Sequence, residues 1–88
     1  MNYDKTSDLL KALAHPVRLK IVEGLLSNEC HVDKIVHKMG LPQSTISQHL
    51  AILKNRGILD IKKTGVKTCY RVVDKKIALL LKIFSKYQ

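Results

Sequence analysis

The chain has 88 residues, 45% of them hydrophobic, and carries a formal net charge of +9 at pH 7. Such a short chain forms one domain with a small core, so additional burial against a partner subunit is expected. No stretch approaches the roughly 18 apolar residues that a membrane span needs, and the first residues do not resemble a secretory signal. Two cysteines are too few for a disulfide framework, which favours a reducing cytoplasm. The basic balance favours a polyanionic partner, with nucleic acid ahead of a membrane surface.

The positive charge is concentrated in the second half of the chain. Residues 1–40 hold 6 Lys or Arg and 5 Asp or Glu, a net charge of +1, whereas residues 41–88 hold 10 and 2, a net charge of +8. The segment 41–53 has no Lys or Arg and holds neutral side chains that form hydrogen bonds: Gln43, Ser44, Thr45, Ser47, Gln48 and His49. This layout is expected if the neutral segment reads base edges and the basic segment contacts phosphates. The alternative is a solvated polar helix face beside a solvated basic surface.

Two helices are expected before residue 30. Ser7 or Asp8 is placed to cap a first helix that runs through Ala14, and His15-Pro16 ends it because the residue before proline avoids the helical conformation. Pro16 suits the first turn of a second helix, where its missing N–H is not needed. That helix has an apolar stripe at helical spacing and ends at Ser27-Asn28-Glu29.

Two further helices are expected before residue 57. A short third helix runs roughly from Val32 to Met39, and Gly40 is placed to close it in a left-handed cap. A fourth helix runs from about Gln43 to Arg56 and ends at a glycine. On this helix an apolar stripe faces the core, made of Ile46, Leu50 and Leu53, and most of the neutral polar side chains fall on the opposite side.

A hairpin and a last helix complete the predicted elements. The runs 58–63 and 66–73 are rich in β-branched residues and flank Thr64-Gly65, so they predict two antiparallel strands whose tip carries Lys62, Lys63 and Lys67. Val66 is expected on one face of the second strand. Asp74 can cap a last helix. The prediction is mainly α with a small β-hairpin: one winged helix-turn-helix domain over residues 1–88, with five helices and a two-stranded wing.

Several strings of the sequence resemble the ArsR/SmtB family of bacterial transcriptional regulators. Residues 13–22, LAHPVRLKIV, look like the family's opening "ALA-x-P-x-R-L-x-I-L", and residues 41–53, LPQSTISQHLAIL, are similar to its recognition-helix signature "Q-S-x-x-S-x-H-L-x-x-L". Gly57-Ile58-Leu59 and Tyr70-Arg71-Val72 match the entry and exit of its wing. The sequence of these two segments is most similar to PagR-like members of the family, which lack the usual metal sites.

The resemblance implies a homodimer that binds double-stranded DNA, with its two recognition helices in successive major grooves of an operator palindrome. It implies a repressor or similar regulator rather than an enzyme, and no motif of a catalytic site appears. Dimerisation would involve the first and last helices, through Leu9, Leu10, Leu13, Ile77, Leu80, Leu81 and Phe84. The location would be the cytoplasm, at the nucleoid.

Carried over from the family, the DNA-contact positions are Gln43, Ser44, Ser47, Gln48 and His49, with Thr45 beside them. Glutamine is able to pair bidentately with adenine, and serine bonds either bases or phosphates. His49 lies closer to the apolar face, so a buried, hydrogen-bonded histidine is an equal alternative. Phosphate contacts are expected from Lys54, and Lys62, Lys63 and Lys67 are expected near phosphates or a minor groove; the alternative is that the hairpin lysines are merely solvated. Arg18 and Lys20 bond phosphates or keep the second helix soluble.

The sensor sites of the family are largely missing from the sequence. Residues 29–35, ECHVDKI, align with the metal motif "E-L-C-V-C-D-L" so that His31 and Asp33 replace its two cysteines. That pair would suit Zn(II), Ni(II) or Co(II), but two ligands make a weak site and Asp33 also suits the start of the third helix. No cofactor is predicted. A metal-responsive switch and a protein-interaction (antirepressor) module with weak DNA binding remain the alternative functions.

Cys30 and Cys69 are interpreted as two inert thiols. A disulfide requires Cα atoms within about 7 Å of each other, and the predicted topology does not bring the two cysteines together within one subunit. The redox sensors of this family place their pair on the second and last helices, which this sequence does not do.

Overall fold

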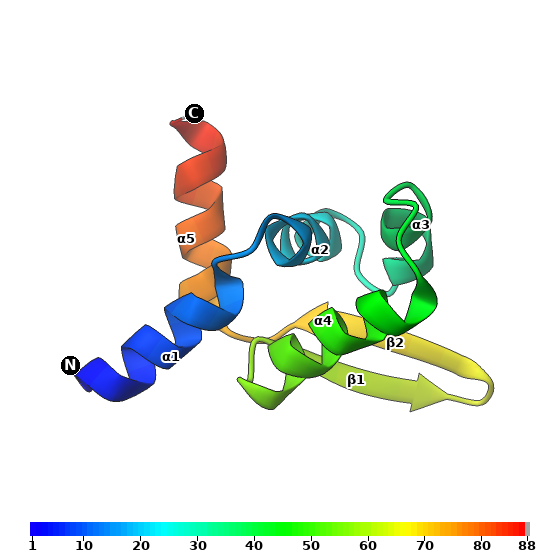
Figure 1. The fold of residues 1–88 in the computed structure, drawn as a ribbon, viewed down its shortest axis with the longest axis horizontal. Coiled ribbons are helices and arrows are strands. Elements are labelled where there is room, and N and C mark those ends of the chain that lie inside the picture. The colour runs from blue at the N-terminus through cyan, green and yellow to red at the C-terminus, as the bar shows by residue number, and fades with distance from the viewer. Residues whose placement is uncertain (88) are drawn as a thin grey trace.

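The computed structural model describes residues 1–87 and contains five helices and a two-stranded antiparallel hairpin (Figure 1). The elements in chain order are α1 (Tyr3–Leu13), α2 (Pro16–Ser27), α3 (Val32–His37), α4 (Gln43–Asn55), β1 (Leu59–Thr64), β2 (Lys67–Val72) and α5 (Lys75–Lys86). The predicted winged helix-turn-helix is thereby confirmed, with α3 and α4 as the helix-turn-helix and the hairpin as the wing.

Three helices begin at a side chain that accepts hydrogen bonds from their first turn. Asn2 accepts from the backbone N–H of Lys5, at 3.1 Å, so α1 begins at Tyr3 and the predicted start at Ser7 or Asp8 was wrong. Asparagine is as good a cap as serine or aspartate, and nothing between the two positions interrupts the helix. His15 caps α2, and Asp74 caps α5 as predicted.

The turns differ from the predictions by one or two residues. α3 ends at His37, and two further turn residues lead to Gly40, whose φ of 64° is the left-handed conformation expected there. Thr64 pairs with Lys67 across the hairpin, so Gly65 and Val66 form the turn. Val66 is therefore fully exposed at the tip of the wing, and its predicted place on a strand face was wrong.

The core lies where the helices meet the hairpin. Its buried hydrophobic side chains are Ala12, Leu13, Ile21, Val22, Leu25, Val32, Ile46, Leu50, Leu53, Ile58, Leu59, Ile77 and Leu81. The predicted inward stripe of α4 is thus confirmed. α2 and α3 approach so closely that a Cβ added to Gly24 would lie 2.7 Å from Cδ1 of Ile35.

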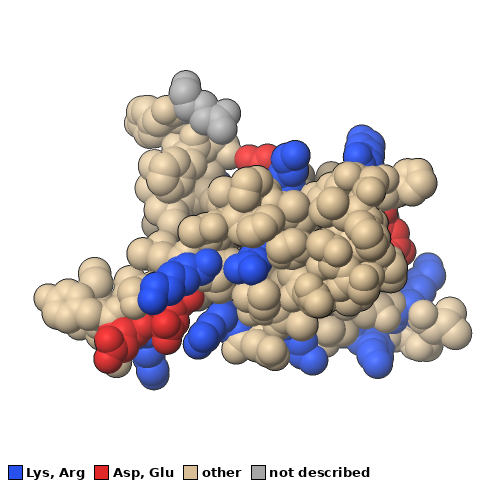
Figure 2. Space-filling model, viewed as in Figure 1, with Lys and Arg blue, Asp and Glu red and all other residues tan. Residues whose placement is uncertain are grey.

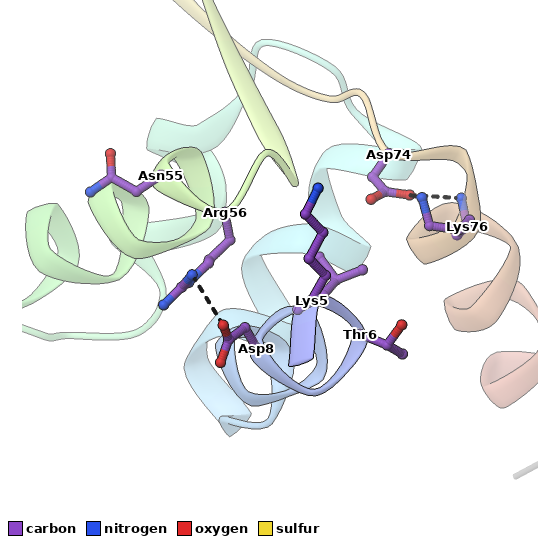
Figure 3. Close-up of a pocket in the computed structure, with 8 residues that line it drawn as sticks. Lys5, Thr6, Asp8, Asn55, Arg56, Asp74 and Lys76 are labelled. Atoms are coloured by element: carbon purple, nitrogen blue, oxygen red, sulfur yellow. Dashed lines mark hydrogen bonds and ion pairs between the residues drawn. The ribbon is translucent and has the colours of Figure 1, made fainter. Parts of the chain in front are cut away.

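The two ends of the molecule hold different elements. α1 and α5 lie together at the end where both termini lie, and the hairpin extends toward the opposite end with α4 running across it (Figure 1). An ion pair of 3.7 Å between Asp8 and Arg56 joins α1 to the end of α4 (Figure 3). None of the helices in residues 1–87 combines the length and apolar character required to cross a membrane.

Candidate nucleic-acid interface

The outer face of α4 carries a row of neutral polar side chains. Gln43, Ser44, Ser47 and Gln48 are exposed, and Thr45 is half-buried. Ser44, Ser47 and Gln48 lie on the side of the helix away from Leu50 and Leu53, which are anchored in the core. The amide of Gln43 donates to the hydroxyl of Ser47 at 3.5 Å, the outer limit for a hydrogen bond, so both groups remain available to an external partner. This face therefore offers donors and acceptors without a fixed charge.

His49 does not belong to this exposed row. Its side chain is only 9% exposed, and its Nδ1 accepts a hydrogen bond of 3.1 Å from Nε of Arg18. A second nitrogen of the same guanidinium donates to the carbonyl of Ala12, also at 3.1 Å. Arg18 thus joins α1, α2 and α4. The structure supports the structural alternative for His49, and Arg18 holds helices together rather than standing free in solvent.

The surroundings of His49 favour its neutral form. Burial lowers the pKa of the imidazole below its ordinary value of 6.5, and the nearby His15 and Arg18 lower it further. The His15 ring lies 4.5 Å from the His49 ring, centroid to centroid. Arg18 needs an acceptor at Nδ1, which only the neutral imidazole provides. Sequence periodicity does not reveal the contact between Arg18 and His49, because the two residues lie 31 positions apart along the chain.

The wing presents the predicted lysines on both of its faces. Lys62, Lys63, Lys67 and also Lys54 of α4 are exposed, and within residues 1–87 none of the four lies in an ion pair. By contrast, Arg71 of β2 pairs with Asp60 at 3.5 Å. Figure 2 shows Lys and Arg spread over α4 and the hairpin on this face, while the acids of the same view gather mainly over α1. The acid of the wing, Asp60, is thus paired with Arg71, and the charges of the four lysines are not neutralised by an ion pair.

His31 and Asp33, the candidate metal ligands, are not part of a group of three potential ligands in the described residues. His31 and Asp33 are exposed, and Asp33 lies in the first turn of α3, as its alternative interpretation had it. Among residues 1–87, the only group of three potential ligands within 4.8 Å of one another is Glu29, Cys30 and Cys69. The pair His31 and Asp33 therefore has no third ligand in place.

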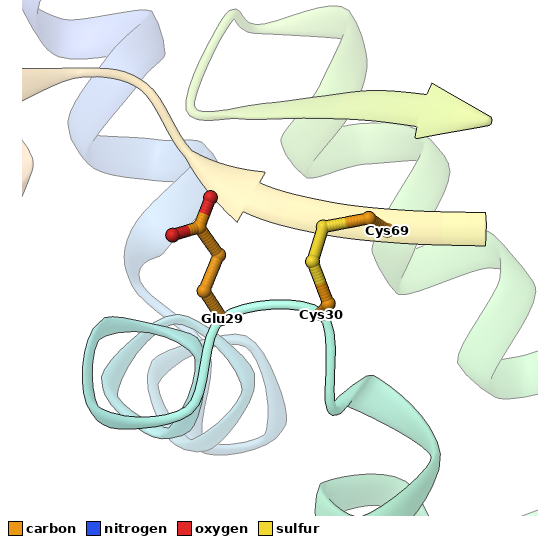
Figure 4. A group of neighbouring side chains, drawn as sticks. All are labelled: Glu29, Cys30 and Cys69. Atoms are coloured by element: carbon orange, nitrogen blue, oxygen red, sulfur yellow. A yellow bond between two sulfur atoms is a disulfide. The ribbon is translucent and has the colours of Figure 1, made fainter. Parts of the chain in front are cut away.

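The two cysteines are bonded to each other, which overturns the prediction that the topology keeps them apart. Their Cα atoms are 4.1 Å apart and the sulfurs form a disulfide beside Glu29 (Figure 4). α2 packs against β2, so the turn after α2 passes directly alongside the second strand. The backbone N–H of Cys30 donates to the carbonyl of Tyr70 at 3.1 Å. The packing of this turn against the strand cannot be predicted from the sequence pattern.

The predicted dimer residues divide into three groups by burial. Leu13, Ile77 and Leu81 lie in the core of the chain itself, Leu9 and Leu80 are half-buried, and Leu10 and Phe84 are exposed. Other apolar side chains of α1 and α5 are exposed as well: Tyr3, Leu79, Ile83 and Tyr87. The uncovered apolar surface of the two helices thus includes residues that were not predicted to take part in the dimer contact.

The fold and this surface define a class: a winged helix-turn-helix protein in which α4 presents an exposed neutral face and the wing is basic. The model of the bacterial regulatory protein, arsR family, matches residues 15–60. The transcriptional repressor PagR of Bacillus anthracis is 34% identical over 89 residues, which cover 100% of this chain and 89% of PagR. The chain belongs to the arsR family, and the resemblance inferred from its sequence is confirmed.

Solved structures share the fold of this chain over nearly its whole length. Reduced HlyU from Vibrio cholerae N16961 matches with a TM-score of 0.87 and 31% identity, covering 98% of this chain and 90% of that one. The homodimeric winged helix-turn-helix DNA-binding domain of Mb0332 from Mycobacterium bovis matches with a TM-score of 0.82 and 28% identity, covering 97% and 79%. These relatives are regulators rather than enzymes.

Proposed function

We propose that the chain is a dimeric, sequence-specific regulator that binds double-stranded DNA, reading bases with α4 and contacting phosphates with the wing. The observation that carries this is the exposed neutral face of α4 next to lysines that no acid neutralises. Side chains such as Gln48 and Gln43 bond base edges in the major groove, whereas Lys62, Lys63 and Lys67 supply attraction that is independent of sequence.

The N-terminus of α4 also suits an anionic partner. No side chain caps its first turn and no acid lies there, in contrast to α1 and α5. The free backbone N–H groups of a helix N-terminus attract a phosphate. His49 is left out of the proposed contacts because it is buried and already bonded to Arg18. Its proposed role is to hold α4 in place.

A second copy of the chain is the proposed partner of α1 and α5. Leu79, Ile83 and Phe84 expose 61%, 49% and 62% of their surface on α5, and an exposed apolar face of this kind marks an interaction surface. Mb0332, which shares the fold, is a homodimer. Two copies joined there present two α4 helices to one duplex, and a palindromic operator mirrors that symmetry.

The proposed action is repression in the cytoplasm, at the nucleoid. The support for repression is the similarity to the repressor PagR over the full chain. Protein bound to the operator would exclude the transcription machinery from that DNA, and no cofactor is proposed for this.

Selection of bound duplexes from a random library by the purified full chain tests this function. The expected result is an enriched palindrome with half-sites about one helical turn apart, which binds far more tightly than a shuffled duplex of the same length. Affinity should fall steeply as salt is raised, because lysine contacts release counterions from the phosphates. Binding without any enriched sequence, or no binding at low salt by a folded dimer, would contradict the proposal and favour a protein-interaction module.

A further inference from the structure

A disulfide joins the wing to the turn that leads into the helix-turn-helix. Cys30 lies between α2 and α3, Cys69 lies in β2, and 39 residues separate them along the chain (Figure 4). Cys30 is exposed and Cys69 is half-buried, so solvent reaches Cys30 more readily than Cys69. The bond therefore links the two substructures that the proposed DNA contact uses.

The backbone at Cys30 is held in a conformation that a cysteine rarely adopts. Its φ is +70°, and within residues 1–87 it is the only non-glycine residue with a positive φ. Glycine adopts this conformation without a steric penalty, so a cysteine there indicates that its sulfur is needed. The hydrogen bond from its N–H to Tyr70 holds the turn against β2 independently of the sulfurs. Cys30 thus stays positioned beside Cys69 when the disulfide is open.

We propose that Cys30 and Cys69 form a reversible dithiol–disulfide site that fixes the wing to the helix-turn-helix. The effect on DNA rests on the proposed function, while the chemistry of the pair does not. A protein that works on DNA in a reducing compartment meets reductants continually, and disulfides that form there are transient or sensing rather than structural. An exposed pair already held together by the backbone is suited to open and close.

The oxidant is a low-molecular-weight disulfide such as oxidised glutathione. The thiolate of the exposed Cys30 attacks one sulfur of the reagent, forming a mixed disulfide and releasing one small thiolate. The thiolate of Cys69 then attacks the sulfur of Cys30 and displaces the second small thiolate. One reagent disulfide is reduced to two thiols, and the two protein thiols lose their protons and two electrons in forming one disulfide.

Closing the bond changes the freedom of the wing rather than its fold. Residues 62–68 are exposed along the hairpin, and a two-stranded hairpin is only marginally stable by itself. DNA binding must order these residues, and a cross-link at Cys69 restricts them in advance. The expected result is that the oxidised protein binds its operator about three- to tenfold more tightly than the reduced protein.

The chemistry is tested with the full chain in buffers of reduced and oxidised glutathione at a series of ratios. Intact mass and thiol alkylation should show one intramolecular disulfide, lost again when the reduced thiol is in excess. C69S should accumulate the mixed disulfide on Cys30, whereas C30S should accumulate far less on the half-buried Cys69. Disulfides between separate chains, or a pair that stays reduced at every ratio, would overturn the site.

The effect on the wing is tested without DNA by hydrogen exchange. Backbone amides of residues 61–70 should exchange more slowly in the oxidised wild type than in the reduced wild type, and the double variant C30S/C69S should show no redox dependence. Affinity for the selected operator is then measured for the same forms. Unchanged exchange in the wing, or equal affinity of both forms for the operator, would overturn the coupling to the wing.

Two further outcomes distinguish the redox site from failure of the proposed function and from a metal site. If neither form binds duplex DNA, the proposed function fails, while mass and exchange data still decide the disulfide and its effect on the wing. Glu29 lies beside the two sulfurs, and two thiolates with a carboxylate suit Zn(II). Stoichiometric Zn(II) binding by the reduced wild type but not by C30S, together with resistance to oxidised glutathione, would replace the redox site by a metal site.

Discussion

Nε of Arg18 donates a hydrogen bond of 3.1 Å to Nδ1 of His49, which joins α2 to the helix proposed to read DNA. The same guanidinium donates to the carbonyl of Ala12 near the end of α1. One side chain therefore sets the relative positions of three helices. The contact between Arg18 and His49, on the inner side of α4, therefore fixes the orientation of the exposed polar face of this helix.

Replacing Arg18 with methionine should lower the free energy of unfolding by about 1–3 kcal/mol, because a buried imidazole nitrogen and a carbonyl lose their charged donor. The matched control is Arg56→Met, which removes the ion pair to Asp8 where the arginine side chain is 53% exposed. That loss should be below about 1 kcal/mol. Urea unfolding of both variants measures the difference, and equal losses would show that the Arg18 contact adds no more than a surface pair.

Acid should destabilise the protein through His49. Its pKa in the folded chain is lowered from 6.5, so between the two pKa values the unfolded chain binds more protons than the folded chain. Stability is therefore complete above pH 6.5 and falls as the pH drops through the lowered pKa. Urea unfolding at a series of pH values should show this fall in the wild type and a weaker one in His49→Gln, which retains an acceptor for Arg18. His37→Gln, at an exposed position of α3, should behave as the wild type.

Gly24→Ala should destabilise the protein, against the usual trend for a helix. A glycine-to-alanine change inside a helix normally adds about 0.5–1 kcal/mol of stability. Here the new Cβ would lie 2.7 Å from Cδ1 and 2.9 Å from Cγ1 of Ile35. We expect a net loss of about 1–2 kcal/mol from overpacking. In Gly24→Ala/Ile35→Ala the clash is gone, so the double variant should lose less than the sum of the single losses; strict additivity would refute the close packing of α2 and α3.

Gln48 and Lys63 should affect DNA binding in different ways. Gln48→Ala should weaken binding to the selected operator by about 1–3 kcal/mol, because the glutamine amide would contact a base edge. Binding to a shuffled duplex should be unaffected. Lys63→Ala should weaken both duplexes and lower the slope of log affinity against log salt by about 1. Titrations of both duplexes at several salt concentrations measure this. Equal losses on both duplexes for Gln48→Ala would remove it from base reading.

Cys30→Gly should distinguish backbone strain from the role of the sulfur. Under reducing conditions the variant should be about 1 kcal/mol more stable than Cys30→Ser, because glycine accepts the φ of +70°. Under oxidising conditions the wild type should exceed both variants by about 2–4 kcal/mol, the usual contribution of a disulfide. Unfolding in urea with and without reductant gives both comparisons, and a Cys30→Gly variant no more stable than Cys30→Ser would speak against strain at this turn.

Local patterns predicted most of the fold because each depends on neighbours in the chain. The spacing of Ile46, Leu50 and Leu53 defines the inward face of α4, and Asp74 caps α5 by bonding amides two and three residues away. The exposed row of α4 follows from the same periodicity. Such features are visible without knowledge of the rest of the molecule.

Contacts between distant segments could not be predicted in this way. His49 lies at the edge of the apolar stripe, and only the position of Arg18 on another helix decides that it is buried and bonded. The cysteine pair depends on how α2 packs on β2, which carries the turn at Cys30 alongside the strand. Neither spacing nor composition contains that information.

The exposed apolar face of α5 has a consequence for how the regulator responds to its own abundance. In the proposed dimer, Leu79, Ile83 and Phe84 leave water when a second subunit covers them. While subunits are mostly separate, the amount of dimer rises with the square of the subunit concentration. Occupancy of a two-half-site operator then follows that square as well. A modest change in synthesis or degradation of the chain would therefore switch its target over a narrow range of cellular levels.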